Sequence, residues 1–167
     1  MANYRGHLGG AVVICAAYVI GVTLLPVQWV EKTGGMLSNW QIVAALFVVA
    51  MLFGLWPDVD TNSKAQDIFF AIAFIADIAL IVVGRLEAAA YLGLLAMTPI
   101  VGKHRGWTHN KLAMIVVPLP IVIAPYLYQS ENLVPSLLFY GAALAGYFSH
   151  LLLDGLIWKR FRLKGDW

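Results

Sequence analysis

Three pairs of polar residues in this chain have the types and spacing of metal ligands. His150 and Asp154 are four residues apart, so on a helix they lie about 40° apart on one face and can bind one ion. Burying an aspartate in a membrane-spanning helix costs about 2.5–3.5 kcal/mol on insertion scales, which disfavours an uncompensated pair. The pair therefore indicates a metal site, and the alternative is a hydrogen bond that only packs helices.

A second pair, Asp58 and Asp60, follows Pro57 in the segment Pro-Asp-Val-Asp-Thr-Asn-Ser. The proline ends a helix, and in an extended backbone residues two apart point to the same side. Two carboxylates then share a small volume, where they repel each other unless a divalent cation or a proton relieves them. The alternative is a solvated turn that caps the next helix.

The third pair, His104 and His109, lies in a basic segment, five residues apart. On a continuous helix they would be separated by roughly 140°, so a shared metal requires a break in the helix, which Gly106 can provide. Interfacial polar residues beside a belt aromatic, Trp107, are the alternative. The fourth histidine, His7, follows Arg5 at the start of an apolar segment, where a histidine is most often a surface residue.

The composition is that of an integral membrane protein. Of the 167 residues 61% are hydrophobic and 12% are charged, and the mean hydropathy is +0.79. The chain is thus far more apolar than a soluble domain of this length. Uncharged stretches long enough to cross about 30 Å of hydrocarbon recur along the chain. We therefore expect an all-α fold, a single transmembrane helical bundle over residues 1–167 with no separate soluble domain.

We predict about six spans. They are Leu8–Gln28, Trp40–Trp56, Ile68–Gly84, Leu86–Gly102, Leu112–Tyr128 and Leu133–Ile157. Only a short link separates the third span from the fourth, which predicts a tight antiparallel hairpin. The fifth carries Pro118, Pro120 and Pro125, which predict a kinked helix. The first resembles a signal peptide but lacks a convincing cleavage site, so we interpret it as a helix.

Basic residues divide unevenly between the two sides that six spans create. One side has Arg5, Lys64, Lys103, Arg105, Lys111, Lys159, Arg160, Arg162 and Lys164, and the other has Lys32 and Arg85. By the positive-inside rule the first side is cytoplasmic, so both termini and all the candidate ligands face the cytoplasm. An anionic leaflet accounts for these charges, so we expect membrane lipids and no nucleic acid as partners. The single Cys15 cannot form an internal disulfide.

Taken together, the imidazoles and carboxylates exceed the four positions of one tetrahedral zinc ion. Two or more divalent ions are therefore predicted. Ions about 3.5–4 Å apart can acidify water and bind both the attacking and the leaving oxygen of a phosphoester. The pattern thus indicates metal-dependent hydrolysis.

Four segments resemble the YdjM-type family of predicted membrane-bound metal-dependent hydrolases. They are Arg-Gly-His near the start, Pro-Asp-Val-Asp-Thr-Asn-Ser, His-Arg-Gly-Trp-Thr-His-Asn, and Gly-Tyr-Phe-Ser-His-Leu-Leu-Leu-Asp. The resemblance keeps the motif order over nearly the whole chain. It implies a metal core similar to that of zinc-dependent phospholipase C enzymes and nucleases. The ligands it implies are His7, Asp58, Asp60, His104, His109, His150 and Asp154.

We therefore expect a hydrolase, with zinc as the favoured metal, that cleaves a small or lipid-linked phosphoester at the cytoplasmic membrane face. Metal-activated water would attack phosphorus while Arg105, with Lys103, binds the phosphate. The expected catalytic residues are Asp58, Asp60, Arg105 and His150. Two alternatives stay open: an ion or solute transporter that uses Asp77, an acid inside the third span, and a non-catalytic zinc-binding membrane protein. The oligomeric state is also open.

Overall fold

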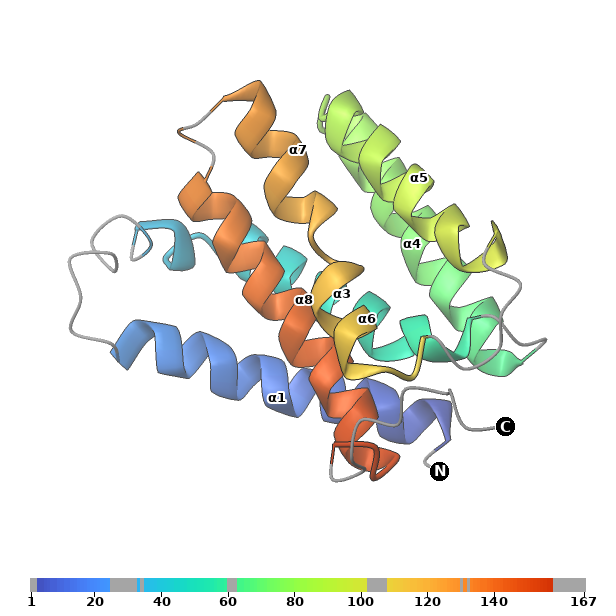
Figure 1. Ribbon diagram of the computed structural model, residues 1–167. Helices are drawn as coiled ribbons and strands as arrows, with labels where there is room; N and C mark the ends of the chain where they lie inside the picture. The colour runs from blue at the N-terminus through green and yellow to red at the C-terminus, as the bar shows by residue number, and fades with distance from the viewer. Residues whose placement is uncertain are drawn as a thin grey trace.

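The structure, a computed structural model, describes residues 3–24, 33, 35–59, 63–101, 108–129, 131 and 133–157, with the backbone alone for 98–101 and 128. The regular elements are helices, and these ranges contain no strand. They form the bundle of Figure 1. The elements are α1 (Tyr4–Leu24), α3 (Trp40–Leu55), the 3₁₀ turn η1 (Trp56–Asp58), α4 (Lys64–Val82), α5 (Leu86–Val101), α6 (Lys111–Val116), α7 (Pro120–Tyr128) and α8 (Leu133–Leu153). The predicted all-α membrane bundle is confirmed.

Four of these segments are long and apolar enough to cross a membrane: Tyr4–Leu24, Trp40–Asp58, Lys64–Val82 and Leu133–Leu153. Leu86–Met97 and Lys111–Leu127 are shorter apolar segments at the positions of the fourth and fifth predicted spans. The count of six spans therefore stays a prediction. Large apolar side chains such as Phe74, Ile75 and Val82 are 67–82% exposed on α4, as expected of a surface that contacts lipid.

Helices α1, α3 and α8 pack closely because small residues line their contacts. A Cβ atom on Gly146 of α8 would collide with the backbone carbonyl of Ala50 on α3. One turn further along α3, a Cβ atom on Gly54 would lie 2.8 Å from the Cβ atom of Ala11 on α1. The absence of side chains at these two glycines therefore lets the three backbones meet.

The predicted hairpin and the predicted kink are both present. Helices α4 and α5 pack against each other across a turn at Gly84, whose φ of +77° suits glycine. The fifth predicted span is broken at residues 117–119, between α6 and α7, and Pro118 lies in the break. Proline has no N–H to donate within a helix, and its ring clashes with the preceding turn. Pro118 therefore explains the interruption.

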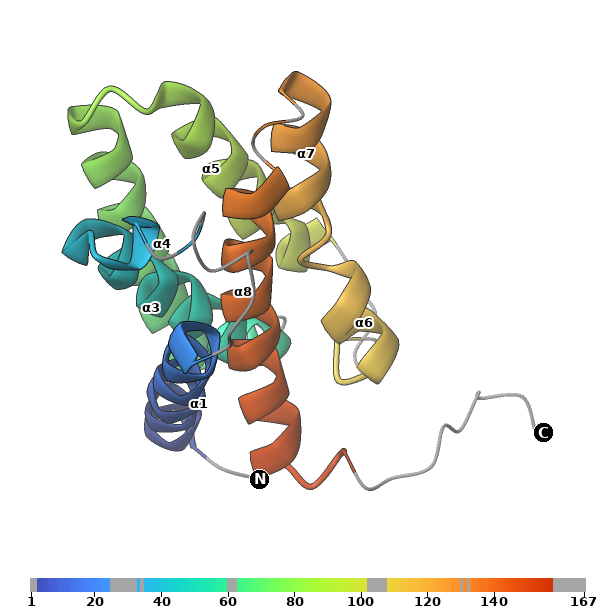
Figure 2. The same ribbon diagram turned by 90° about the vertical axis from the view of Figure 1, so that its left-hand side faces the viewer.

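Five elements meet at one end of the bundle, called here the site end. Helices α1, α4 and α6 begin there, α8 ends there, and η1 joins the end of α3 to it (Figure 2). In Figure 2, α8 runs between α1 on one side and α6 and α7 on the other. Trp56 of η1 is 1% exposed and stacks on Phe53, which fixes this turn in the core two residues before Asp58.

Candidate metal centre

The structure brings five of the predicted ligands together at the site end. His7 comes from the second turn of α1, Asp58 from η1, His109 from the turn before α6, and His150 and Asp154 from the end of α8. Asp60, His104 and Arg105, also predicted to belong to the site, lie outside the described residues, as does Lys103. The described part of the site thus contains three imidazoles and two carboxylates.

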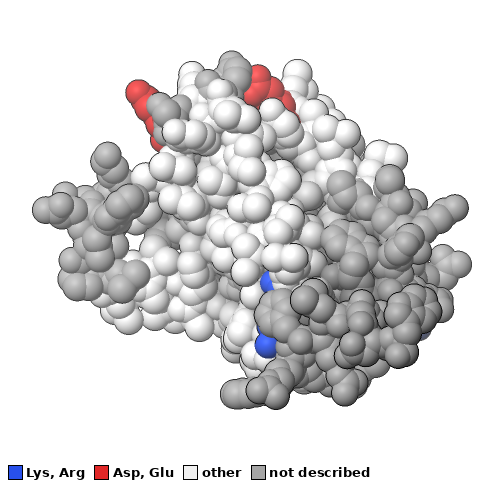
Figure 3. Space-filling view, in the orientation of Figure 1, with Lys and Arg blue, Asp and Glu red and all other residues white. Residues whose placement is uncertain are grey.

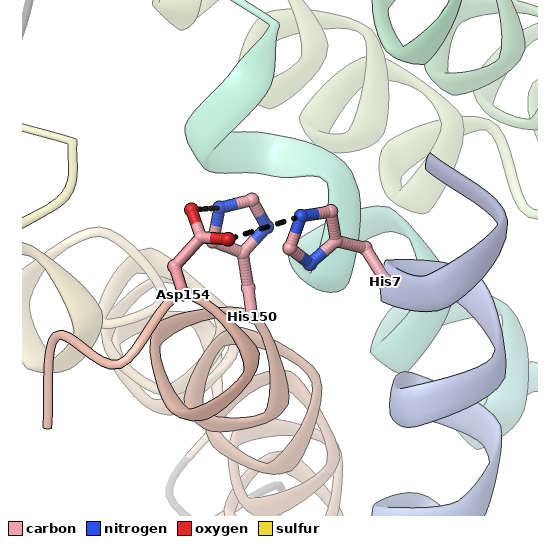
Figure 4. Close-up of side chains that lie close together, drawn as sticks. All are labelled: His7, His150 and Asp154. Carbon is pink, nitrogen blue, oxygen red and sulfur yellow. Dashed lines mark ion pairs between the residues drawn. The ribbon is translucent and has the colours of Figure 1, made fainter. Parts of the chain in front are cut away.

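The His150–Asp154 pair adopts the geometry expected from its spacing. The Nε2 atom of His150 lies 3.6 Å from Oδ2 of Asp154, one helical turn away. Nε2 of His7 lies 3.6 Å from the other carboxylate oxygen, Oδ1 (Figure 4). Asp154 therefore faces two imidazoles, one from its own helix and one from α1.

Asp58 connects this group to the third imidazole. Its Oδ1 atom lies 3.4 Å from Nε2 of His109 and 3.7 Å from Nε2 of His150. Its Oδ2 atom lies 3.8 Å from Nε2 of His7. Two overlapping groups of three can each hold an ion: His7 with His150 and Asp154, and Asp58 with His109 and His150. Because His150 offers one Nε2 atom to both groups, the five residues form a single connected cluster.

Hydrogen bonds at Nδ1 orient two of the cluster's three rings, those of His150 and His109. Nδ1 of His150 lies 2.8 Å from the carbonyl oxygen of Gly54, in the last turn of α3. A carbonyl oxygen can only accept, so Nδ1 carries the proton, and in the neutral ring Nε2 presents a lone pair to the carboxylates. Nδ1 of His109 lies 3.2 Å from Oγ1 of Thr108. Such a bond at Nδ1 is the usual support of a histidine that binds metal through Nε2.

The donor distances fit ligands of one metal centre. With metal–ligand distances of about 2.0–2.2 Å, two donors on one tetrahedral ion lie about 3.4 Å apart. The nitrogen–oxygen separations of 3.4–3.8 Å in the cluster are close to that value. Imidazole lone pairs and carboxylate oxygens repel each other, so this approach requires a cation or protons between them.

Unsatisfied polar atoms support the same fit. Both ring nitrogens of His7 and Nε2 of His150 are buried and have no hydrogen-bond partner among the described residues. An unsatisfied buried polar atom costs about 1–3 kcal/mol, so several in one place call for a ligand. Imidazole nitrogen together with carboxylate oxygen suits zinc, manganese or iron. The cluster therefore fits a divalent transition metal.

The five residues differ in exposure, which gives the cluster a closed side and an open side. The side chains of His7, His150 and Asp154 are at most 2% exposed. Those of Asp58 and His109 are 25% and 22% exposed. Water or a substrate can therefore reach the cluster only from the side of Asp58 and His109, as far as the described residues define it.

Sequence reasoning missed the residues that support the ligands. The Gly54 carbonyl acts through its backbone, so no residue type signals it. Thr108 directly precedes His109, and this adjacency is the one feature of the sequence that indicates its supporting role. Tyr147 is buried and lies one turn before His150. Its hydroxyl donates a hydrogen bond to the carbonyl oxygen of Thr108. Its place in an apolar segment made it look like an ordinary core residue.

The chain belongs to the YdjM inner membrane protein family, whose family model matches residues 2–160. Neither the curated proteins nor the solved structures gave a match to this chain. The match covers all five clustered ligands and every described helix. The family description makes the chain an inner membrane protein, in agreement with its apolar helices.

Proposed function

We propose that this member of the YdjM inner membrane protein family is a metal-dependent hydrolase that cleaves a phosphoester of a lipid or lipid-linked substrate. The observation that carries the proposal is the convergence of three imidazoles and two carboxylates, from four separate segments, at one end of a membrane bundle. Charged ligands in such a place are costly unless they bind something.

His7, His150 and Asp154 would hold the metal from the closed side, and Asp58 and His109 would complete its ligands at the open side. A divalent cation supplies Lewis acidity to a phosphoryl oxygen and makes water more acidic. Zinc is the favoured ion because imidazoles dominate the donor set. Asp60 and His104, if they join the cluster, would bring enough donors for a second ion.

Asp58 is the best-placed proton acceptor. Its carboxylate is the more exposed of the two, at 25% against 2% for Asp154. In the proposed reaction the oxygen of a water molecule bonds to phosphorus, and one of its protons passes to the Asp58 carboxylate. The phosphorus–oxygen bond to the leaving alcohol then breaks, and the leaving oxygen takes that proton. Asp60 and Arg105 are proposed to assist, Arg105 by binding the phosphate.

The position of the cluster supports a lipid substrate. The ligands lie at the ends of apolar helices, so we expect them near the headgroups of a membrane, where a lipid would arrive by lateral diffusion within its leaflet. A water-soluble phosphoester has no comparable advantage.

The proposed side is the cytoplasm. Of the four described basic residues, Arg5, Lys64 and Lys111 lie at the site end, and Arg85 lies in the α4–α5 turn at the opposite end. Figure 3 shows basic side chains low on one face and acidic ones at its top, with an uncharged region between them. This is the asymmetry that the positive-inside rule associates with a cytoplasmic site end.

The test is elemental analysis of the purified protein, followed by a hydrolysis screen of lipid phosphoesters with and without chelator. We expect bound divalent metal and chelator-sensitive turnover, both lost in His150→Ala. Ser149→Ala is the matched control, because this neighbouring side chain is equally buried but donates its hydrogen bond to the carbonyl of Gly146. Metal retained without turnover of any phosphoester would point to the non-catalytic zinc protein instead.

One observation favours a second candidate, an ion transporter. The Oδ1 atom of Asp77, in the C-terminal half of α4, is buried and has no hydrogen-bond partner among the described residues. Ionisable residues at such depth often mark ion pathways. Ion flux in liposomes that requires Asp77 but not His150 would support transport.

A further inference from the structure

We infer that Thr108 is a positioning residue that fixes the tautomer of His109, because its hydroxyl links the ring of His109 to the Pro57 carbonyl in η1. The inference rests on the proposed metal centre for its purpose, but its geometry stands independently. Thr108 is fully buried, and its hydroxyl makes two hydrogen bonds.

The direction of these bonds follows from the chemistry of the partners. The hydroxyl oxygen of Thr108 lies 3.2 Å from the carbonyl oxygen of Pro57, which can only accept, so the hydroxyl proton points there. With its one proton used, Oγ1 can only accept from Nδ1 of His109, also at 3.2 Å. His109 is therefore held with its proton on Nδ1 and, when neutral, a lone pair on Nε2 that faces Asp58.

The backbone of residues 54–57, at the end of α3 and in η1, orients the rings of both His150 and His109. The carbonyl of Gly54 accepts directly from His150, and the carbonyl of Pro57, three residues later, acts on His109 through Thr108. In both imidazoles Nδ1 is thus occupied by a hydrogen bond, which leaves Nε2 as the ring nitrogen for an ion. The end of α3 and η1 thus position ligands that come from two other segments. Tyr147 connects Thr108 to α8 through its hydrogen bond to the Thr108 carbonyl.

Thr108 is suited to this relay because it has one donor and one acceptor in a small volume. Valine has nearly the same shape without either function, whereas serine keeps both and loses only a methyl group. Supports of this kind typically change metal affinity by about 10–100-fold when removed.

The first test needs no metal. In chelator-treated protein labelled with ¹⁵N-histidine, nitrogen NMR reports the tautomer of His109, whose signals are assigned by their loss in His109→Gln. We expect the Nδ1–H form in the wild type and in Thr108→Ser, and a shift toward the Nε2–H form in Thr108→Val. An Nε2–H form in the wild type would overturn the inference without any variant, as would an unchanged tautomer in Thr108→Val.

The second test is a double-mutant cycle on zinc affinity. Thr108→Val should weaken zinc binding about 10–100-fold in the wild type and in His7→Ala, but by no more than about twofold in His109→Ala, because its effect passes through that ring. Thr23→Val on α1, an exposed threonine with a local bond to Ile20, is the matched control and should change nothing. Equal losses in all backgrounds would indicate a merely structural role. Wild-type protein that binds no zinc would overturn the proposed function, while the tautomer would still decide the role of Thr108.

Discussion

The imidazole rings of His7 and His150 are stacked, with centroids 3.8 Å apart and planes inclined by 15°, although they come from the first and last described helices. Two positively charged rings would repel at this distance, so the arrangement suits neutral rings that share a cation. His7→Ala should therefore lower zinc affinity by at least about 100-fold, more than the loss of a supporting residue. Competition with a chromophoric chelator measures this.

The partly buried Tyr4, near His7 on α1, provides the control for that variant. Tyr4→Phe changes the same helix without touching the cluster and should retain wild-type zinc affinity, since the hydroxyl contacts Arg5. Unchanged zinc binding in His7→Ala would remove His7 from the ligand set.

Asp58 faces all three imidazoles and lies on the open side, so its substitution should affect turnover most. Asp58→Asn keeps the shape but removes the charge and the proton acceptor. We expect a fall in kcat of about 10²–10⁴-fold, the range for loss of a general base. Rates of phosphoester hydrolysis at saturating zinc separate this loss from weaker metal binding.

Asp67→Asn is the matched control, because Asp67 is an exposed aspartate in the first turn of α4, near the same end of the bundle. It should keep normal rates. If Asp58→Asn also hydrolysed substrate normally, another group would have to accept the proton.

Local patterns predicted part of this site, and tertiary packing determined the rest. Helical periodicity predicted that His150 and Asp154 lie on one face. Pro118 predicted the break between α6 and α7. The burial of His7 in the cluster could not be predicted from the residues beside it, because they are typical of the exposed start of a helix. It depends on the close approach of α1 to α8, where a Cβ on Gly10 would lie 2.7 Å from Leu153. Such contacts join residues that are far apart in the sequence.

Gly146 should be intolerant of any side chain. A Cβ there would collide with the Ala50 carbonyl and force α8 away from α3, which also carries the Gly54 carbonyl that supports His150. Gly146→Ala should destabilise the fold by about 1–3 kcal/mol and reduce zinc occupancy. Thermal unfolding in detergent together with metal analysis detects both effects.

Gly21→Ala provides the comparison, since a Cβ at this position of α1 meets nothing within 4 Å. Alanine favours a helix over glycine by up to about 1 kcal/mol, so this variant should be neutral or slightly stabilised. Equal stability of the two variants would show that the α3–α8 contact is looser than described.

Asp77→Asn should separate hydrolysis from transport. The residue lies in the C-terminal half of α4, and the cluster lies at the end of the bundle where α4 begins, so loss of its charge should leave zinc content and hydrolysis unchanged. Parallel assays of phosphoester turnover and of ion flux in liposomes examine both functions in one preparation. A variant that loses flux but keeps hydrolysis would assign Asp77 a separate activity, and one that loses hydrolysis would connect it to the metal centre.

Removal of metal should destabilise the whole bundle, because the proposed ligands come from α1, η1, the turn before α6 and the end of α8. An ion that binds only the folded state stabilises it by about 2.7 kcal/mol at 100 times its Kd. Chelator-treated protein should therefore unfold at a lower temperature than zinc-loaded protein, and zinc should restore the Tm. In His150→Ala the Tm should no longer respond to zinc, because a buried ligand shared by both groups of donors is gone. A Tm that ignores zinc in the wild type would mean that these four segments are held together by packing alone.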